Sequence, residues 1–122
     1  MLVTLGRPGT AALSLQPKGV RYPIMLRGGA SSDGAVFRQI FIEQEYRPLY
    51  GTSDVESVLD LGANIGVSAI AFLTTFPNAR VVAVEPDPEN HRICSQNLAA
   101  YGTRARAILG AVNPRAFSIT LK

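Results

Sequence analysis

The stretch VLDLGANIG at residues 58–66 decides the fold of this chain. It begins with apolar residues typical of a buried strand, and the strand ends near the carboxylate of Asp60. Gly62 and Gly66 follow, and glycines allow the sharp backbone turn that opens a helix. A second apolar strand ends in Glu85, about 20 residues further on, which is the spacing at which an acid reaches ribose hydroxyls in strand–helix–strand nucleotide folds. The sequence therefore predicts a site for a nucleoside cofactor.

The charge at the end of the first strand indicates which cofactor this is. Dinucleotide sites hold a pyrophosphate at the glycine turn, where N–H groups favour an anion and a carboxylate does not. Asp60 stands two residues before the first glycine and would repel a pyrophosphate. S-adenosylmethionine carries ammonium and sulfonium groups and no phosphate, so it is the expected cofactor. The spacing GANIG also differs from the Gly-x-Gly-x-x-Gly of dinucleotide binders, which disfavours the alternative of a nicotinamide-dependent oxidoreductase half.

Each residue of this motif has an expected role and a structural alternative. Gly62 and Gly66 would form the turn under the methionine end of the cofactor, or a tight turn with no ligand. Asp60 would attract the ammonium group, or cap the next helix. Glu85 would accept hydrogen bonds from both ribose hydroxyls, or remain a solvated acid at the strand end. Asn64 would donate to the cofactor carboxylate, or serve the turn itself.

Further segments accompany residues 58–66: AVEPDPEN at 83–90, Asn97-Leu98, and the upstream Asp33, Phe37 and Glu45-Tyr46. With these residues, the chain resembles the FkbM-type family of S-adenosylmethionine-dependent methyltransferases over about residues 26 to 113. The resemblance implies a class I, Rossmann-like fold and methylation of a hydroxyl group on a sugar or a secondary metabolite. A small-molecule hydroxyl acceptor is therefore the expected partner.

The resemblance also extends the expected site. By analogy with class I enzymes, residues 110–112 would lie near the adenine ring. Asp33 and Tyr46 would close over the cofactor or the substrate, although Asp33 also fits a helix N-cap and Tyr46 a helix-end aromatic. No catalytic residue can be named. The expected cofactor-binding residues are Asp60, Gly62, Ala63, Asn64, Gly66, Glu85, Pro86 and Ala111.

The expected fold is α/β. Residues 1–52 should form an N-terminal β-hairpin, with strands near 13–16 and 22–26, and a helix that Ser32 or Asp33 caps and Pro48 ends. Residues 53–122 should form the cofactor-binding half of the methyltransferase domain. Its predicted elements are strands at 55–61, 80–85 and 105–111, helices at 65–76 and from the N-cap Asp87 to about 100, and a short strand at 117–121.

Right-handed crossovers place the three parallel strands in the order 3-2-1. The apolar first strand suits a sheet that is covered on both faces. Class I methyltransferases are usually seven-stranded, so we expect either a fragment or a naturally shortened member. A non-catalytic or degenerate module that acts through assembly is the alternative. The outer edge of the first strand lacks a fourth strand, and we expect the N-terminal hairpin, a second copy or a separate chain to cover it.

Composition narrows the remaining possibilities. The chain has twelve Lys and Arg against nine Asp and Glu, and no basic run of the kind that binds nucleic acid. It contains no apolar window of 18 residues and no signal-peptide pattern, so no membrane partner is expected. One cysteine excludes an internal disulfide and fits a reducing, cytoplasmic location. His91 and Cys94 have the spacing of half a metal site, but no second pair exists, so no metal is expected.

Overall fold

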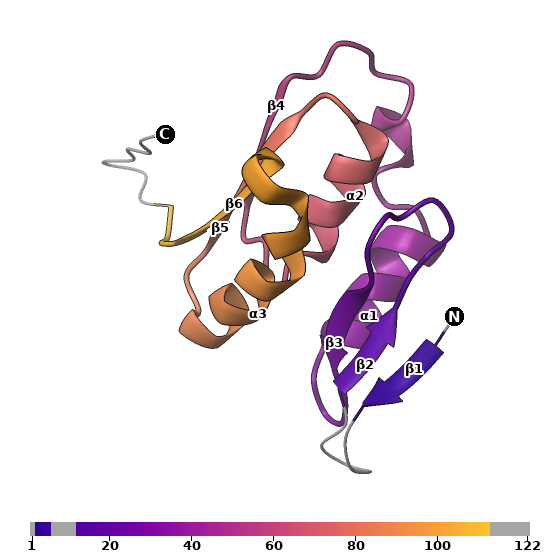
Figure 1. The fold of residues 1–122 in the computed structure, drawn as a ribbon, viewed down its shortest axis with the longest axis vertical. Helices are drawn as coiled ribbons and strands as arrows, with labels where there is room; N and C mark the ends of the chain where they lie inside the picture. Colours follow the sequence, from indigo (N-terminus) through magenta and orange to yellow (C-terminus); the bar gives the residue numbers. More distant parts are fainter. Residues whose placement is uncertain (1, 6–11, 113–122) are drawn as a thin grey trace.

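The computed structural model describes residues 2–5 and 12–112, which form two separate three-stranded sheets (Figure 1). The first sheet is antiparallel and contains β1 (Leu2–Leu5), β2 (Ala12–Leu15) and β3 (Ile24–Arg27), in that order. The strands β2 and β3 form the predicted hairpin around the turn that closes with a bond from Val20 N to Pro17 O. The strand β1 was not predicted.

The second sheet is parallel and contains β4 (Ser57–Leu61), β5 (Arg80–Glu85) and β6 (Ala105–Leu109). Its order is β4-β5-β6, so the predicted neighbours are confirmed, and Val58, Val81 and Ala105 lie in register across it. The fold class is the predicted one, an α/β fold with a Rossmann-like half-sheet.

Short helices link the strands. They are α1 (Asp33–Phe37), the π-helix η1 (Arg38–Ile42), the 3-10 helix η2 (Arg47–Leu49), α2 (Val67–Thr75), α3 (Pro88–Leu98) and the 3-10 helix η3 (Ala99–Arg104). None of the helices in the part of the chain that the structure describes is long and apolar enough to cross a membrane.

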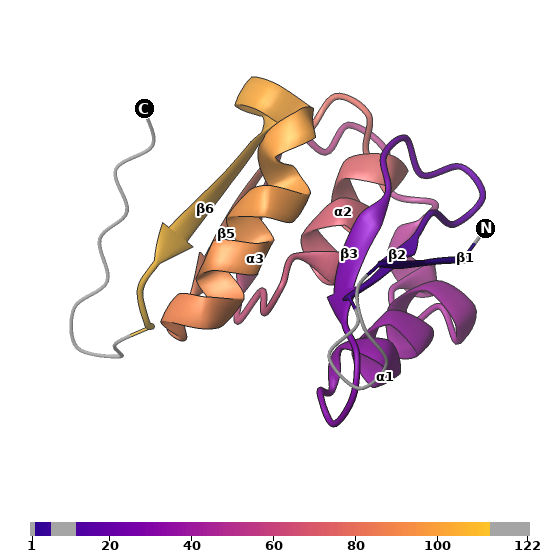
Figure 2. The same cartoon turned by 60° about the horizontal axis from the view of Figure 1, so that its bottom comes forward.

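The helices α2 and α3 lie on the same face of the parallel sheet. Figure 2 shows α3 along β5 and β6, α2 beside it, and the antiparallel sheet on the other side of these helices. Successive right-handed crossovers that move in one direction place their helices on one face. The prediction that both faces are covered is therefore wrong: Leu59 and Leu61 point to the opposite face and remain 47% and 46% exposed.

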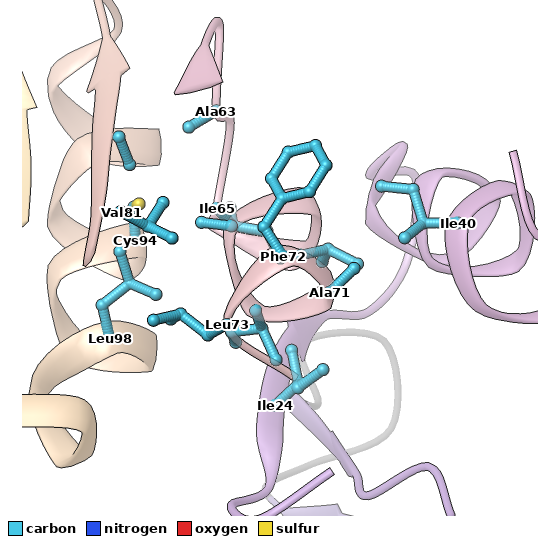
Figure 3. Packing of buried hydrophobic residues seen from close by; sticks show 14 of the residues in the cluster. Ile24, Ile40, Ala63, Ile65, Ala71, Phe72, Leu73, Val81, Cys94 and Leu98 are labelled. Atoms are coloured by element: carbon cyan, nitrogen blue, oxygen red, sulfur yellow. The ribbon is translucent and has the colours of Figure 1, made fainter. Parts of the chain in front are cut away.

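A single hydrophobic cluster holds the two sheets and the helices together. Figure 3 shows Cys94 and Leu98 of α3 on one side of the cluster, Ile40 on the other, and Phe72 and Ala71 of α2 between them. Ile24 of β3 belongs to the same cluster, together with Ile40 of η1. The predicted N-terminal segment and the predicted cofactor-binding half thus share one core.

The first helix differs from its prediction. It changes to a π-helix after Phe37 and ends near Glu43, whose N–H bonds to Arg38 O, and Gln44 then takes a left-handed conformation. Pro48 therefore does not end this helix but lies inside η2. The N-cap position is Ser32, yet its side chain makes no capping bond.

The structure tests one of the three covers expected for the edge of β4, the N-terminal hairpin. Within residues 2–5 and 12–112, β4 pairs only with β5, and the hairpin belongs to its own sheet. The possibility that the hairpin pairs with β4 is therefore wrong. A groove of about 490 Å³ runs beside this strand, with Tyr46, Leu49 and Phe72 among its walls. The predicted strand at 117–121 lies outside the described residues.

Candidate cofactor site

The glycine turn lies at the carboxyl end of the parallel sheet, between β4 and α2. Gly62 and Gly66 have φ values of 75° and 96°, in the left-handed region that favours glycine. The backbone N–H groups of Gly62 and Ala63 both donate to Val84 O, at 2.8 and 3.0 Å. The turn is therefore fixed to the last residues of β5, where the second acid lies.

The two glycines face different surroundings. A Cβ on Gly62 would meet no atom within 4 Å, whereas a Cβ on Gly66 would lie 3.2 Å from Cys94 Sγ. Gly66 thus allows close packing of the turn on α3. Gly62 leaves an open approach to the backbone, which is the feature that a bound cofactor requires of this turn.

The carboxylate of Glu85 joins the turn to the loop after β5. Its Oε1 accepts a hydrogen bond from Asn64 N at 3.0 Å, and its Oε2 accepts one from Asp87 N at 2.9 Å. Only 4% of the residue is exposed, so the alternative of a solvated acid is wrong. Each carboxylate oxygen has two acceptor sites, so each retains capacity for one further hydrogen bond.

Asp60 holds the end of β4 to the start of α2. Its Oδ2 accepts a hydrogen bond of 2.5 Å from the hydroxyl of Ser68, in the first turn of that helix. Burial raises the pKa of Asp60, and the bond from Ser68 offsets this only in part. The N-cap of α2 is Gly66 and no side chain caps it, so Asp60 contacts this helix through the Ser68 hydroxyl and does not cap it.

The other predicted site residues lie around the same sheet edge. Ala63 is buried, so it presents only its backbone to the turn, while Asn64 and Pro86 are exposed. Gly110 N donates to Glu85 O at 3.1 Å, which holds the exposed Ala111 near the end of β5. The structure therefore brings the predicted residues of three strand ends together.

Of the two upstream residues, Asp33 lies away from the glycine turn, whereas Tyr46 lines the groove beside β4 together with Asp60. The carboxylate of Asp33 is buried and binds Arg27, so it is neither a helix cap nor a group at the glycine turn. The ring of Tyr46 packs against that of Phe72, with centroids 4.7 Å apart. Asp33 does not cap its helix because the guanidinium is the stronger partner of a buried carboxylate.

The pair of His91 and Cys94 does not form a metal site. Cys94 is fully buried, and burial raises its thiol pKa to about 12. His91 Nε2 lies 3.3 Å from Ala107 O. Among the described residues no three side chains of the metal-ligating kinds come together.

Asn97 is part of the site's support, and its role was not predicted. Its side-chain oxygen accepts from Met25 N at 2.9 Å, and its amide donates to Met25 O at 3.1 Å and to Ile65 O at 2.8 Å. Its side chain thus makes the two backbone hydrogen bonds with Met25 that a neighbouring strand would make. It also binds the backbone of the glycine turn at Ile65. No local pattern could have predicted this, since Asn97 and Met25 are 72 residues apart.

Comparisons with known proteins bear on the fold. No protein-family model matches the chain, and no curated sequence matches it. Solved structures do match, among them an S-adenosylmethionine-dependent methyltransferase from Agrobacterium tumefaciens, at 18% identity and a TM-score of 0.57 over 88% of this chain. The chain has part of a methyltransferase fold.

Further solved structures match in the same way. TYW2 from Pyrococcus horikoshii, solved in complex with MeSAdo, matches with a TM-score of 0.57 at 18% identity over 88% of this chain. The C-terminal domain of precorrin-6Y C5,15-methyltransferase from Rhodobacter capsulatus matches 72% of this chain with a TM-score of 0.50 and 18% identity, and the match spans 44% of that domain. The chain spans only 38% of the Agrobacterium and TYW2 structures.

Proposed function

We propose that this chain is the cofactor-binding part of an S-adenosylmethionine-dependent methyltransferase. One observation carries the proposal: the hydrogen bond between Asn64 N and Glu85 Oε1 holds the second acid beside the open approach to Gly62. An acid and an uncovered glycine turn at adjacent strand ends fit a nucleoside whose hydroxyls need acceptors. The methyltransferase fold supports the same cofactor.

The residues present fit S-adenosylmethionine. Glu85 would hold the ribose, the backbone at Gly62 and Asn64 would face the methionine end, and Asp60 would attract the ammonium group. Pro86 and Ala111 would border the adenine side. Asp60 also opposes a pyrophosphate at this turn, which weighs against the nicotinamide alternative.

The proposed reaction is methylation of a hydroxyl group. The proposal rests on the FkbM-type resemblance, and the acceptor would be a sugar or a secondary metabolite. S-adenosylmethionine supplies an activated methyl group, so the protein's task is to align the acceptor and exclude water. We assign no catalytic base to the described residues.

A second candidate is a module that binds the cofactor without catalysis. The apolar side chains of Leu59 and Leu61 remain exposed on one face of the parallel sheet, which favours a part that works in an assembly. We propose that a further polypeptide, either a second copy or a different chain, covers the β4 edge. Transfer of label from methyl-labelled S-adenosylmethionine to an acceptor separates the two candidates.

The test of the cofactor proposal is the variant Glu85→Gln. We expect S-adenosylmethionine to bind more weakly by about 1.5 to 3 kcal/mol, the range for hydrogen bonds to a charged group. Glu89→Gln is the matched control, because Glu89 lies exposed at the start of α3 and pairs with Arg92. Unchanged affinity in a folded Glu85→Gln chain would remove this acid from the ribose site.

A further inference from the structure

Arg27, the last residue of β3, connects the antiparallel sheet to the helix that follows Glu85. Its Nη2 donates to Asn90 Oδ1 at 2.7 Å, although the two residues are 63 positions apart. Asn90 is the third residue of α3, and its backbone N–H donates to Asp87 Oδ2 at 2.8 Å. The guanidinium thus holds the first turn of α3.

Asp33 fixes the position of this guanidinium. Its two oxygens accept from Arg27 Nε at 2.9 Å and Nη2 at 2.8 Å, and Oδ2 also accepts from Arg27 N at 2.8 Å. A bidentate pair of this kind sets the orientation of the arginine as well as its distance. Asp33 is 3% exposed, so little water competes for it.

The same contacts continue to the cofactor acid. Asp87 receives the N–H of Asn90 through its side chain, and its own N–H donates to Glu85 Oε2 at 2.9 Å. Glu85 Oε1 in turn accepts from Asn64 N in the glycine turn. An unbroken series of contacts therefore leads from Asp33 to the turn.

We propose that Arg27 is a positioning residue for the cofactor site. By holding Asn90, it keeps residues 85–90 in the arrangement that directs the Glu85 carboxylate at the ribose. Pro86 and Asp87 are exposed and lie outside strand and helix, so this segment depends on contacts from outside itself. The inference rests on the proposed function, because it assigns the purpose of Arg27 through Glu85.

The test removes the acceptor of Arg27 and leaves the ion pair with Asp33 in place. The variant Asn90→Ala does this, and Asn90→Asp restores an acceptor for the guanidinium. Arg92→Ala is the matched control, since Arg92 is two residues away on α3 and pairs only with the exposed Glu89 among the contacts described. Each purified 122-residue chain is titrated with S-adenosylhomocysteine and with its 2′-deoxyribose counterpart.

The ratio of the two affinities is the informative quantity. A hydrogen bond from the 2′-hydroxyl to a charged acceptor should give the wild type at least about a tenfold preference for the ribose ligand. We expect this preference to fall to about threefold or less in Asn90→Ala and to return in Asn90→Asp. If Arg27 and Asn90 only stabilised the fold, Asn90→Ala would weaken the binding of both ligands alike and leave the ratio of their affinities unchanged.

The possible outcomes distinguish a failure of the role proposed for Arg27 from a failure of the role proposed for Glu85. If Asn90→Ala keeps the full ribose preference of the wild type, Arg27 does not position Glu85, and the proposed function stands. If the wild type binds neither ligand, or binds both equally, the proposed role of Glu85 fails and the inference fails with it. Loss of the preference in Arg92→Ala would also overturn the inference.

Discussion

At the scale of single residues, the two glycines of the turn should respond differently to the same substitution. Replacing either glycine with Ala lowers the free energy of unfolding by about 1 to 2 kcal/mol, because φ is positive at both positions. Gly66→Ala adds a contact of 3.2 Å with Cys94 Sγ, so we expect a total loss of about 3 kcal/mol, and about 1 kcal/mol for Gly62→Ala. Urea denaturation measures both. Equal losses would mean that the packing of Gly66 on α3 is unimportant.

Removing the charge of Asp60 should stabilise the fold, whereas the glycine substitutions should destabilise it. Burial raises its pKa in the folded chain, so folding disfavours the ionised form and stability falls as the pH rises from the acid's ordinary value through its folded value. At pH 7 we therefore expect Asp60→Asn to be more stable than the wild type, since the amide oxygen still accepts from Ser68. The same variant should bind S-adenosylmethionine more weakly.

Denaturation at pH 7 and at pH 4 measures the effect of Asp60. The gain in stability should shrink at the lower pH, where the native carboxyl is increasingly protonated. Glu56→Gln is a suitable control, because Glu56 is an exposed acid immediately before β4. A destabilised Asp60→Asn chain at pH 7 would show that the charge stabilises the fold.

At the scale of elements, Asn97 connects β3, α3 and the glycine turn. Its side chain is 6% exposed and satisfies Met25 N, Met25 O and Ile65 O. Replacing it with Ala leaves buried backbone groups without partners, and each such group costs about 1 to 3 kcal/mol. We expect Asn97→Ala to lower the free energy of unfolding by about 3 kcal/mol or more.

Chemical denaturation measures the loss in Asn97→Ala. The control is Asn78→Ala, since Asn78 is exposed in the turn between α2 and β5. A loss no larger than that of the control would mean that the antiparallel sheet does not depend on this amide.

Local patterns predicted the elements that local interactions determine. The strand at 80–85 has its predicted bounds, and Asp87 caps α3 as expected, because a run of β-branched residues and a cap followed by proline act over a few positions. The early end of the first helix and the role of Asp33 were not predicted. The role of Asp33 depends on a partner that only folding brings close, because Arg27 of the preceding strand binds its carboxylate.

At the scale of the whole molecule, the uncovered side of the parallel sheet is the main departure from expectation. The apolar pattern of β4 correctly predicted a strand suited to burial on two faces, but a sequence pattern does not state which elements are present to cover it. Here α2 and α3 share one face, and the groove beside β4 is open. The candidate site depends less on this, because the residues described at its edge come from β4, β5, β6 and their loops.

The proposed cover over the β4 side gives a testable prediction. Leu59→Lys changes an exposed side chain, so the unfolding free energy of the isolated chain should change by less than about 0.5 kcal/mol. Association through this side should be lost. Sedimentation equilibrium of wild type and variant measures it, with Val112→Lys as a control at another exposed apolar residue. A wild type that stays monomeric at all concentrations would exclude a second copy as the cover.

The most direct test of the proposed cofactor site is calorimetric titration of S-adenosylmethionine into the purified chain. NADH is the control ligand, and the oligomeric state is measured on the same sample. We predict micromolar binding of S-adenosylmethionine and no binding of NADH, because Asp60 opposes a pyrophosphate and Glu85 lies beside the open glycine turn. A folded chain that binds NADH, or that binds neither ligand, would contradict the claim that this half-sheet carries a methyltransferase cofactor site.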